Sequence, residues 1–192
     1  MSLIAKENTS EKQLVEIPEG EHEAVCVGVV DLGWHPNEYQ GEKRPDCERV
    51  ALMFELPGIT REWQGEQKPI RKTHTFRNSL HERAKLRKFL QHWKGESLKA
   101  DELLGYKLEQ LVGKNAKLQY LAGKEGKVFL DGIRKFEEGK HKPTDTIIYD
   151  ISTHPTNFEK VPSWMQEEIT TSIRFATDAP DTPVKDDDEV PF

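Results

Sequence analysis

The hydrophobic and polar positions along the first half of the chain predict three β-strands. Residues 21–32 are rich in valine and alternate poorly, as in a strand that is buried on both faces. Residues 49–56 alternate between apolar and other side chains, which predicts a half-buried strand. Residues 68–77 predict a third strand, but neither of its faces is cleanly apolar, so the pattern does not decide which face is core.

The segment between the first two strands, residues 33–47, predicts a long loop. It contains Gly, Pro and Asn together with five charged residues, a composition typical of loops. Trp34 and Tyr39 lie within it. Because a turn-rich loop seldom needs two large aromatic side chains, both residues are candidates for contact with a ligand.

An amphipathic helix follows the third strand. Ser79 and Glu82 match a capping box, in which each side chain satisfies a free backbone N–H at the start of a helix. Four apolar residues then recur at helical spacing: Leu86, Phe89, Leu90 and Trp93. The helix is expected to end near Gly95, and a second short helix is expected at 100–111.

The second half of the chain predicts a hairpin and a smaller C-terminal part. Residues 115–122 and 127–135 predict two strands joined by a turn with glycine at both ends. Residues 146–151 predict a sixth strand, and 162–173 predict a last helix. After residue 175 the composition is too polar and acidic to form a packed core.

The order of three strands, a helix and two strands is that of the OB-fold, a partly open barrel that often binds oligonucleotides. An unrelated α+β sheet has the same order. We expect a mainly β protein, an OB-fold-like five-stranded barrel with a helix between strands three and four, plus C-terminal additions. The expected parts are a flexible arm (1–16), the OB-fold-like DNA-binding domain (17–142), an extension packed on it (143–175) and a disordered acidic tail (176–192).

The charge of the chain is unevenly distributed. The 192 residues carry a net charge of −6, but residues 61–142 contain 20 Lys and Arg against 11 Asp and Glu. A long basic stretch of this kind is typical of a surface that binds a polyanion. The alternative is a solvated surface with an accidental bias.

The last seven residues combine acidity with an apolar end. They are Asp186, Asp187, Asp188, Glu189, Val190, Pro191 and Phe192. An acidic terminus usually serves solubility, which requires no large aromatic ring at the end. Phe192 carries both a ring and the α-carboxylate, so the tip suits an apolar pocket with a cationic rim on a partner protein.

This tip resembles the C-terminal tip of bacterial and phage single-stranded-DNA-binding proteins, which end in several aspartates, an aliphatic residue and Pro-Phe. Val190 takes the place usually held by isoleucine, and Glu189 departs from the pattern but keeps its charge. The resemblance implies that the protein binds single-stranded DNA and that its tip recruits replication, recombination and repair proteins. The linker at 177–185 is short and residues 143–175 have no counterpart in the minimal domain, which favours a phage or prophage version.

Proteins of this kind hold a strand with a basic groove and with aromatic rings that stack on bases, each stack being worth about 1–3 kcal/mol. The cationic candidates are Arg71, Arg77, Lys117, Lys127 and Arg134. The aromatic candidates are Trp34, Tyr39 and Trp63, followed by Phe76 and Phe129. Each aromatic has a packing alternative; Trp63 could cover a barrel end, and Phe76 and Phe129 suit the core equally well.

The sequence carries no pattern that predicts an enzyme. It lacks a glycine-rich phosphate loop and a His-Glu-x-x-His run, and its two cysteines, Cys26 and Cys47, lack metal-ligand spacing. We therefore expect no cofactor and no metal. No apolar run approaches the roughly 20 residues that span a bilayer, so we also expect no membrane and a cytoplasmic location, in a bacterial host or associated with the nucleoid. Two alternatives stay open: a protein-only adaptor that uses the tip, and a strand-annealing recombination protein. A homo-oligomer is compatible with the sequence.

Overall fold

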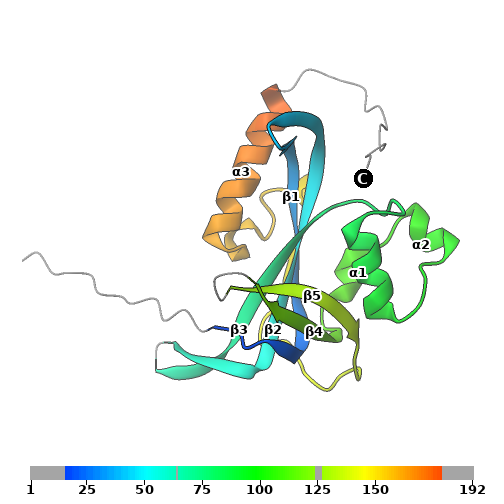
Figure 1. Ribbon diagram of the computed structural model, residues 1–192. Helices are drawn as coiled ribbons and strands as arrows, with labels where there is room; N and C mark the ends of the chain where they lie inside the picture. Colours follow the sequence, from blue (N-terminus) through cyan, green and yellow to red (C-terminus); the bar gives the residue numbers. More distant parts are fainter. Residues whose placement is uncertain (1–15, 64, 124–126, 179–192) are drawn as a thin grey trace, which may run out of the picture.

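The computed structural model describes residues 16–63, 65–123 and 127–178, without the side chains of Tyr39 and of residues 173–178. The protein is mainly β, as predicted, with one six-stranded sheet and few helices (Figure 1). The strands are β1 (Gly20–Tyr39), β2 (Glu42–Trp63), β3 (Glu66–Arg77), β4 (Asn115–Ala122), β5 (Val128–Lys135) and β6 (Ile147–Tyr149). The helices are α1 (Lys85–Lys94), α2 (Ala100–Leu104) and α3 (Ser163–Asp178), with short 3-10 turns at Leu108–Leu111, Ile151–Thr153 and Phe158–Lys160. No helix among the described residues is long and apolar enough to cross a membrane.

The long strand β1 organises the sheet. Its first part, Gly20–Val25, pairs with β4, and the rest pairs with β2 up to the hairpin end. Beyond β4, the same edge of β1 pairs in parallel with the short β6, while the other neighbours are antiparallel. The strand order is therefore β3-β2-β1-β4-β5, with β6 as a branch on β1.

The prediction of a long loop at 33–47 is wrong, because β1 and β2 continue through it as a hairpin. Only Gln40 and Gly41 form the turn, with φ angles of 53° and 82° that suit a two-residue hairpin turn. The prolines that indicated a loop fall within a shift of register, where the strand bulges and a missing N–H costs little. Composition alone could not distinguish this hairpin from a loop.

The predicted helices are present, but the predicted capping box is wrong. Helix α1 begins at Lys85, its N-cap residue Ala84 makes no side-chain hydrogen bond, and Ser79 Oγ instead accepts a hydrogen bond from His81 N–H at 3.2 Å. The apolar stripe of α1 is buried, and Gly95 ends the helix with a φ of 79°, both as predicted. The predicted second helix is shorter than expected and is followed by a 3-10 turn.

Two hydrophobic cores lie on the two faces of β1 and β2. The first contains Leu52 and Phe54 together with the apolar stripe of α1. The second contains Val27 and Met53 and is covered by α3 and β6. The prediction that β1 is buried on both faces is confirmed, whereas the half-buried prediction for β2 is wrong because α3 covers its second face.

Helix α3 approaches β1 closely at Gly33. A Cβ atom at this position would collide with Ser172 of α3, and the φ of 80° also favours glycine. Glu168 of α3 adds an ion pair with Arg49 of β2 at 3.5 Å. Helix α3 thus packs along the β1–β2 hairpin, as Figure 1 shows.

The sheet curls so that β3 and β4 meet inside the first core. These strands are separated by β2 and β1 in the sheet, yet His74 Nε2 and the Tyr120 hydroxyl share a hydrogen bond of 2.9 Å. The register also settles which face of β3 is inner, because His74 and Phe76 lie opposite the buried Leu52 and Val50. Within the described residues no ladder joins β3 to β5, so the curled sheet is open at that seam.

Candidate nucleic-acid interface

The structure distributes the predicted DNA-binding residues over two opposed surfaces. Because the inner faces of β3 and β4 meet, their outer faces point away from each other. We call the surface along β3 and the end of the β2–β3 hairpin the β3 wall; it holds Trp63, Arg71 and Arg77. We call the outer face of β4 and β5 the β5 wall; it holds Lys117, Lys127, Phe129 and Arg134. One short strand of DNA cannot contact both walls along its whole length.

A pocket of about 510 Å³ opens at the hairpin end of the β3 wall. We call it the hairpin pocket; its lining includes Glu55, Arg61, Trp63, Lys68, Arg71, Thr144 and Asp145. The Trp63 ring is 50% exposed, and the guanidinium carbon of Arg61 lies 5.2 Å from its centroid. An exposed indole beside an arginine can stack on a base while the cation contacts the backbone.

Arg71 is held in this pocket by a buried carboxylate. Glu55 is only 1% exposed and accepts a hydrogen bond from Arg71 Nε at 3.2 Å. Thr144 Oγ1 donates to Glu55 at 2.6 Å and accepts from Arg71 at 3.1 Å. Sequence reasoning missed Glu55 and Thr144, because Glu55 falls on the face of β2 that the alternation predicted to be solvent-exposed. Arg71 therefore has a structural partner and presents only its remaining N–H groups outward.

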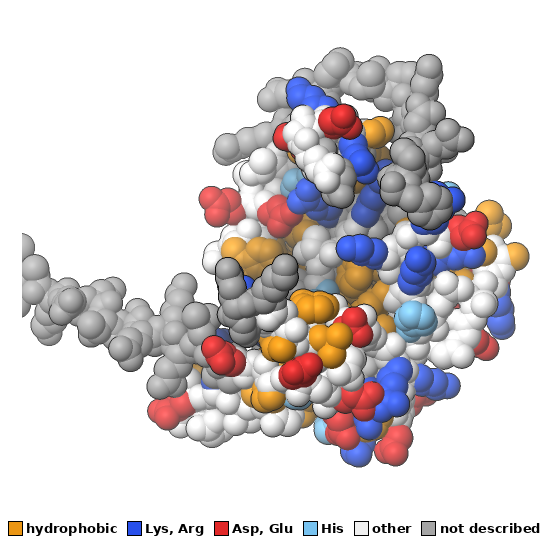
Figure 2. Space-filling model, viewed as in Figure 1, with side chains coloured by type: hydrophobic (Ala, Val, Ile, Leu, Met, Phe, Trp, Pro, Cys, Tyr) orange, Lys and Arg blue, Asp and Glu red, His pale blue; other side chains and the backbone are white. Residues whose placement is uncertain are grey.

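A second pocket, of about 270 Å³, lies at the other end of β3, before α1. We call it the β3-end pocket; it is lined by Thr75, Phe76, Arg77, Ser79, His81, Arg83, Ala84 and Lys85. Three cations line it and no carboxylate does. Phe76 is partly buried against Phe89 of α1, with ring centroids 4.8 Å apart, and forms the apolar side of the pocket. In Figure 2, Lys and Arg side chains gather between the β1–β2 hairpin and α1.

Trp34 lies two strands away from the end of β3. Its indole is 42% exposed, and its register partner on β2 is Glu48. The Glu48 carbonyl in turn accepts a hydrogen bond from Asn78 N–H at 2.8 Å, just beyond β3. Two strand spacings, about 10 Å, therefore separate Trp34 from the end of β3. The backbone of Tyr39 ends β1, and its side chain lies outside the described part of the chain.

Two cations of the β5 wall contact neighbouring side chains. Arg134 forms an ion pair with Glu21 of β1, and the Lys117 ammonium lies 4.9 Å from the centroid of the Phe136 ring. Next to them, His141 Nε2 lies 2.6 Å from a carboxylate oxygen of Glu23, and this hydrogen bond is the main reason that the pKa of Glu23 is lowered. Phe129 is 50% exposed.

The hydrogen-bonded pair that joins the two walls is held in its neutral form. Burial lowers the pKa of His74 to about 4, with a smaller contribution from the charge of Lys72. Burial also raises the pKa of the Tyr120 hydroxyl. At neutral pH the first core therefore contains an uncharged His–Tyr pair that can donate and accept hydrogen bonds.

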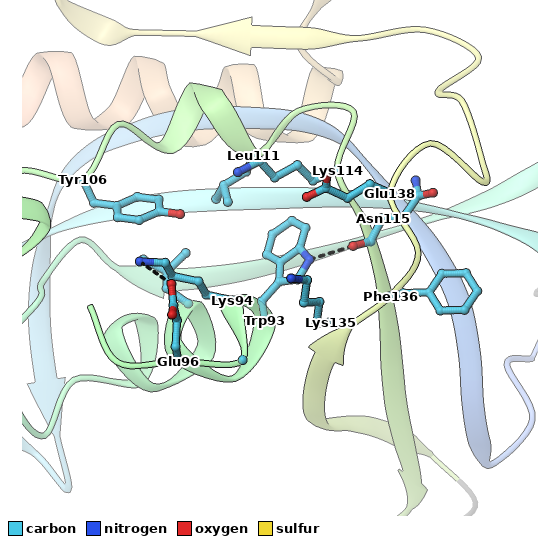
Figure 3. Close-up of a pocket in the computed structure, with 12 residues that line it drawn as sticks. Trp93, Lys94, Glu96, Tyr106, Leu111, Lys114, Asn115, Lys135, Phe136 and Glu138 are labelled. Atoms are coloured by element: carbon cyan, nitrogen blue, oxygen red, sulfur yellow. Dashed lines mark hydrogen bonds and ion pairs between the residues drawn. The ribbon is translucent and has the colours of Figure 1, made fainter. Parts of the chain in front are cut away.

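A third pocket, of about 440 Å³, lies between α1 and the start of β4 (Figure 3). Trp93 Nε1 donates to the Asn115 carbonyl at 2.9 Å along one side of it. Lys94 is paired with Glu96 at 3.2 Å and with Glu102 at 2.7 Å. Three lysines and two glutamates line this pocket, so it attracts a polyanion less than the β3-end pocket, whose lining has three cations and no carboxylate.

The tip residues 186–192 lie outside the described residues. Within the described ranges no group of three or more His, Cys, Asp or Glu is arranged to hold a metal ion. No protein-family model matches this chain, and a search of curated proteins found no match.

Proposed function

We propose that this protein binds single-stranded DNA with little sequence preference and recruits replication, recombination or repair proteins through its C-terminal tip. The proposal that the protein binds DNA rests on the β3 wall, where strand β3 connects two pockets that are lined by cations. The hairpin pocket also contains the exposed ring of Trp63, whereas the β3-end pocket is bordered by Phe76, whose ring packs on Phe89. A basic path with aromatic rings is the usual way to hold a single strand.

The dimensions of the β3 wall suit a short stretch of single strand. From Lys68 to Arg77 the extended backbone spans about 30 Å, at roughly 3.3 Å per residue. OB-folds cover roughly 4–16 nucleotides each. The strand order, the position of α1 between β3 and β4 and the contact between His74 and Tyr120 support an OB-fold-like barrel.

The absence of sequence preference follows from the kind of contact available. Every base has a face that can stack on the exposed Trp63 ring, and phosphate contacts are the same for all bases. Binding should therefore depend strongly on salt and weakly on base composition.

The second half of the proposal is supported by the tip alone. Its acidic run and its terminal ring and carboxylate resemble the tips by which single-stranded-DNA-binding proteins recruit enzymes. Deleting residues 190–192 should abolish partner binding while leaving affinity for DNA equal or higher, because it removes the apolar end of the tip and no cation. A clear loss of DNA affinity in this truncated protein would contradict the assignment.

The decisive experiment is a titration with oligo(dT) followed by tryptophan fluorescence, at about 50 mM and about 200 mM salt. We expect binding that weakens steeply at the higher salt concentration. Trp63→Ala should weaken it about tenfold, by loss of one stack, whereas Phe129→Ala on the β5 wall should change it less than about twofold. Both rings are half exposed, so the second variant is a matched control.

The same titration separates the proposed function from its alternatives. If neither fluorescence nor anisotropy of labelled oligo(dT) shows salt-sensitive binding, the DNA proposal is wrong and the protein-only adaptor takes its place. If binding occurs, an assay with complementary strands decides whether the protein also anneals them.

A further inference from the structure

The two pockets of the β3 wall differ in net charge although each contains three cations. In the hairpin pocket Arg71 is paired with Glu55, and Asp145 also lines the pocket. The lining of the β3-end pocket contains Arg77, Arg83 and Lys85 with no carboxylate. The β3-end pocket therefore has an excess of positive charge that the hairpin pocket lacks.

Two of the three cations of the β3-end pocket, Arg77 and Lys85, keep their charge available; Glu82 is an exposed neighbour in the same loop that does not line the pocket. Within the described ranges no ion pair is found for Arg77 or Lys85. The nearest acidic side chain along β2, Glu48, accepts a hydrogen bond from Asn78 Nδ2 at 2.9 Å instead. The first turn of α1, which borders the pocket, contains no acidic residue.

A single strand offers two kinds of phosphate to such pockets. An internal phosphodiester carries one negative charge and two free oxygens. A terminal phosphate monoester has a second pKa near 6, so it carries a charge of roughly −1.5 to −2 at neutral pH and presents three acceptor oxygens. Arg77 and Lys85 favour the monoester, because each additional charge-assisted hydrogen bond strengthens its binding.

We infer that the β3-end pocket binds the terminal phosphate monoester of a DNA strand, while the hairpin pocket contacts internal phosphodiesters and a stacked base. This inference rests on the proposed function. The partly buried Phe76 and the Ala84 side chain give the pocket an apolar side against which the terminal sugar packs. The strand then runs along β3 from its end toward Trp63.

The test compares three fluorescent oligo(dT) strands of equal length, bearing a 5′-phosphate, a 3′-phosphate or no terminal phosphate. We expect one phosphorylated strand to bind about fivefold more tightly than the unphosphorylated strand at about pH 7.5. The preferred end also gives the direction of the strand on the β3 wall. The preference should shrink as the pH falls below about 6, where the monoester loses its second charge.

Variants assign the preference to the pocket. In the double variant Arg77→Ala, Lys85→Ala, the preferred phosphorylated strand and the unphosphorylated strand should bind with nearly equal affinity. This holds even if the variant weakens the binding of both strands. Lys88→Ala, which removes an exposed cation of α1 outside the pocket, should preserve the ratio. Inorganic phosphate should also remove the preference, compared with chloride at the same ionic strength.

The outcomes separate this inference from the function on which it rests. If all three strands bind equally, the inference is wrong and the proposed function stands. The inference also fails if the preference survives in the double variant, because another site then carries it. If no strand binds, the proposed function fails and the inference fails with it. Circular dichroism of each variant identifies a loss of fold.

Discussion

The β3 wall and the β5 wall carry similar side chains on opposite sides of one curled sheet, but their cations are balanced differently. On the β5 wall, Arg134 is paired with Glu21, and the neighbouring Glu23 contacts both Lys140 and His141. On the β3 wall, Arg77 has no ion pair among the described residues, and the β3-end pocket has no carboxylate in its lining. The comparison shows that a basic stretch of sequence need not give a basic surface.

The cause of the difference lies in β1. Glu21 and Glu23 belong to the acidic first part of the chain, yet they lie opposite Gln119 and Lys117 because β1 pairs with β4. The β1–β4 ladder therefore places carboxylates beside the second half of the basic stretch. No acidic strand neighbours the outer edge of β3 among the described residues, and Arg77 has no ion pair there, although Lys68 and Arg71 of the same strand are paired with Glu66 and Glu55.

The largest effect is expected from reversing charges on each wall in turn. Lys68→Glu, Arg77→Glu should weaken oligo(dT) binding on the order of 100-fold and should reduce the slope of log affinity against log salt by about 1.4, as expected for two lost phosphate contacts. The matched variant Lys117→Glu, Lys127→Glu on the β5 wall should change the affinity less than about threefold. Fluorescence anisotropy at several salt concentrations measures both quantities.

Equal losses in the two variants would remove the distinction between the walls. They would indicate that the strand wraps around the open seam between β3 and β5, or that only the overall charge of the protein matters. If only the β5-wall variant loses affinity for oligo(dT), the DNA interface lies on the β5 wall.

The alternation of apolar and polar residues predicted most strands, because the formation of a strand depends largely on residues that are close together in the sequence. The bounds of β4 agree with the alternation at 115–122, and the buried face of α1 agrees with the helical spacing of its apolar residues. The burial of the second face of β2 could not be predicted, because it depends on α3, which follows more than one hundred residues later. The hairpin at 33–47 was missed because its polar composition suits an exposed ribbon as well as a loop.

The candidate site was predicted only in part, for the same physical reason. The sequence predicted cations and aromatic rings for a surface that binds a DNA strand, but it could not assign them to walls. That assignment depends on which strands meet across the core, and the contact between His74 and Tyr120 joins positions 46 residues apart. The buried Glu55 was missed because its partner Thr144 lies 89 residues away along the chain.

The next largest effect compares two arginines on the outer face of β3. Arg71→Ala should lower the free energy of unfolding by about 2 kcal/mol, because it removes a hydrogen-bond donor and the opposite charge from the buried Glu55 carboxylate. Arg77→Ala should change it by less than about 0.5 kcal/mol, because an exposed side chain without an ion pair contributes little. Urea denaturation measures both, and equal values would show that Glu55 is held mainly by Thr144.

The smallest effect tests whether the two walls meet inside the core, at His74 and Tyr120. The folded protein keeps His74 neutral down to about pH 4, whereas an unfolded chain protonates it near pH 6.5. As the pH falls from about 7.5 to about 5.5, the unfolded state therefore takes up a proton that the folded state does not, and the free energy of unfolding should fall by about 1.3 kcal/mol from this group. Raising the pH above 7.5 should not change the contribution of His74 to the free energy of unfolding, because His74 is then neutral in both states.

The variant His74→Gln isolates this contribution, because a glutamine can still share a hydrogen bond with the Tyr120 hydroxyl but does not titrate. Urea denaturation of both proteins at the two pH values gives the difference, and the carboxylates that also titrate in this range cancel. If the variant loses as much stability as the original on acidification, His74 is accessible to water in the folded protein. The walls would then not be packed together at this contact, and the argument that β3 and β4 face opposite ways would lose its main support.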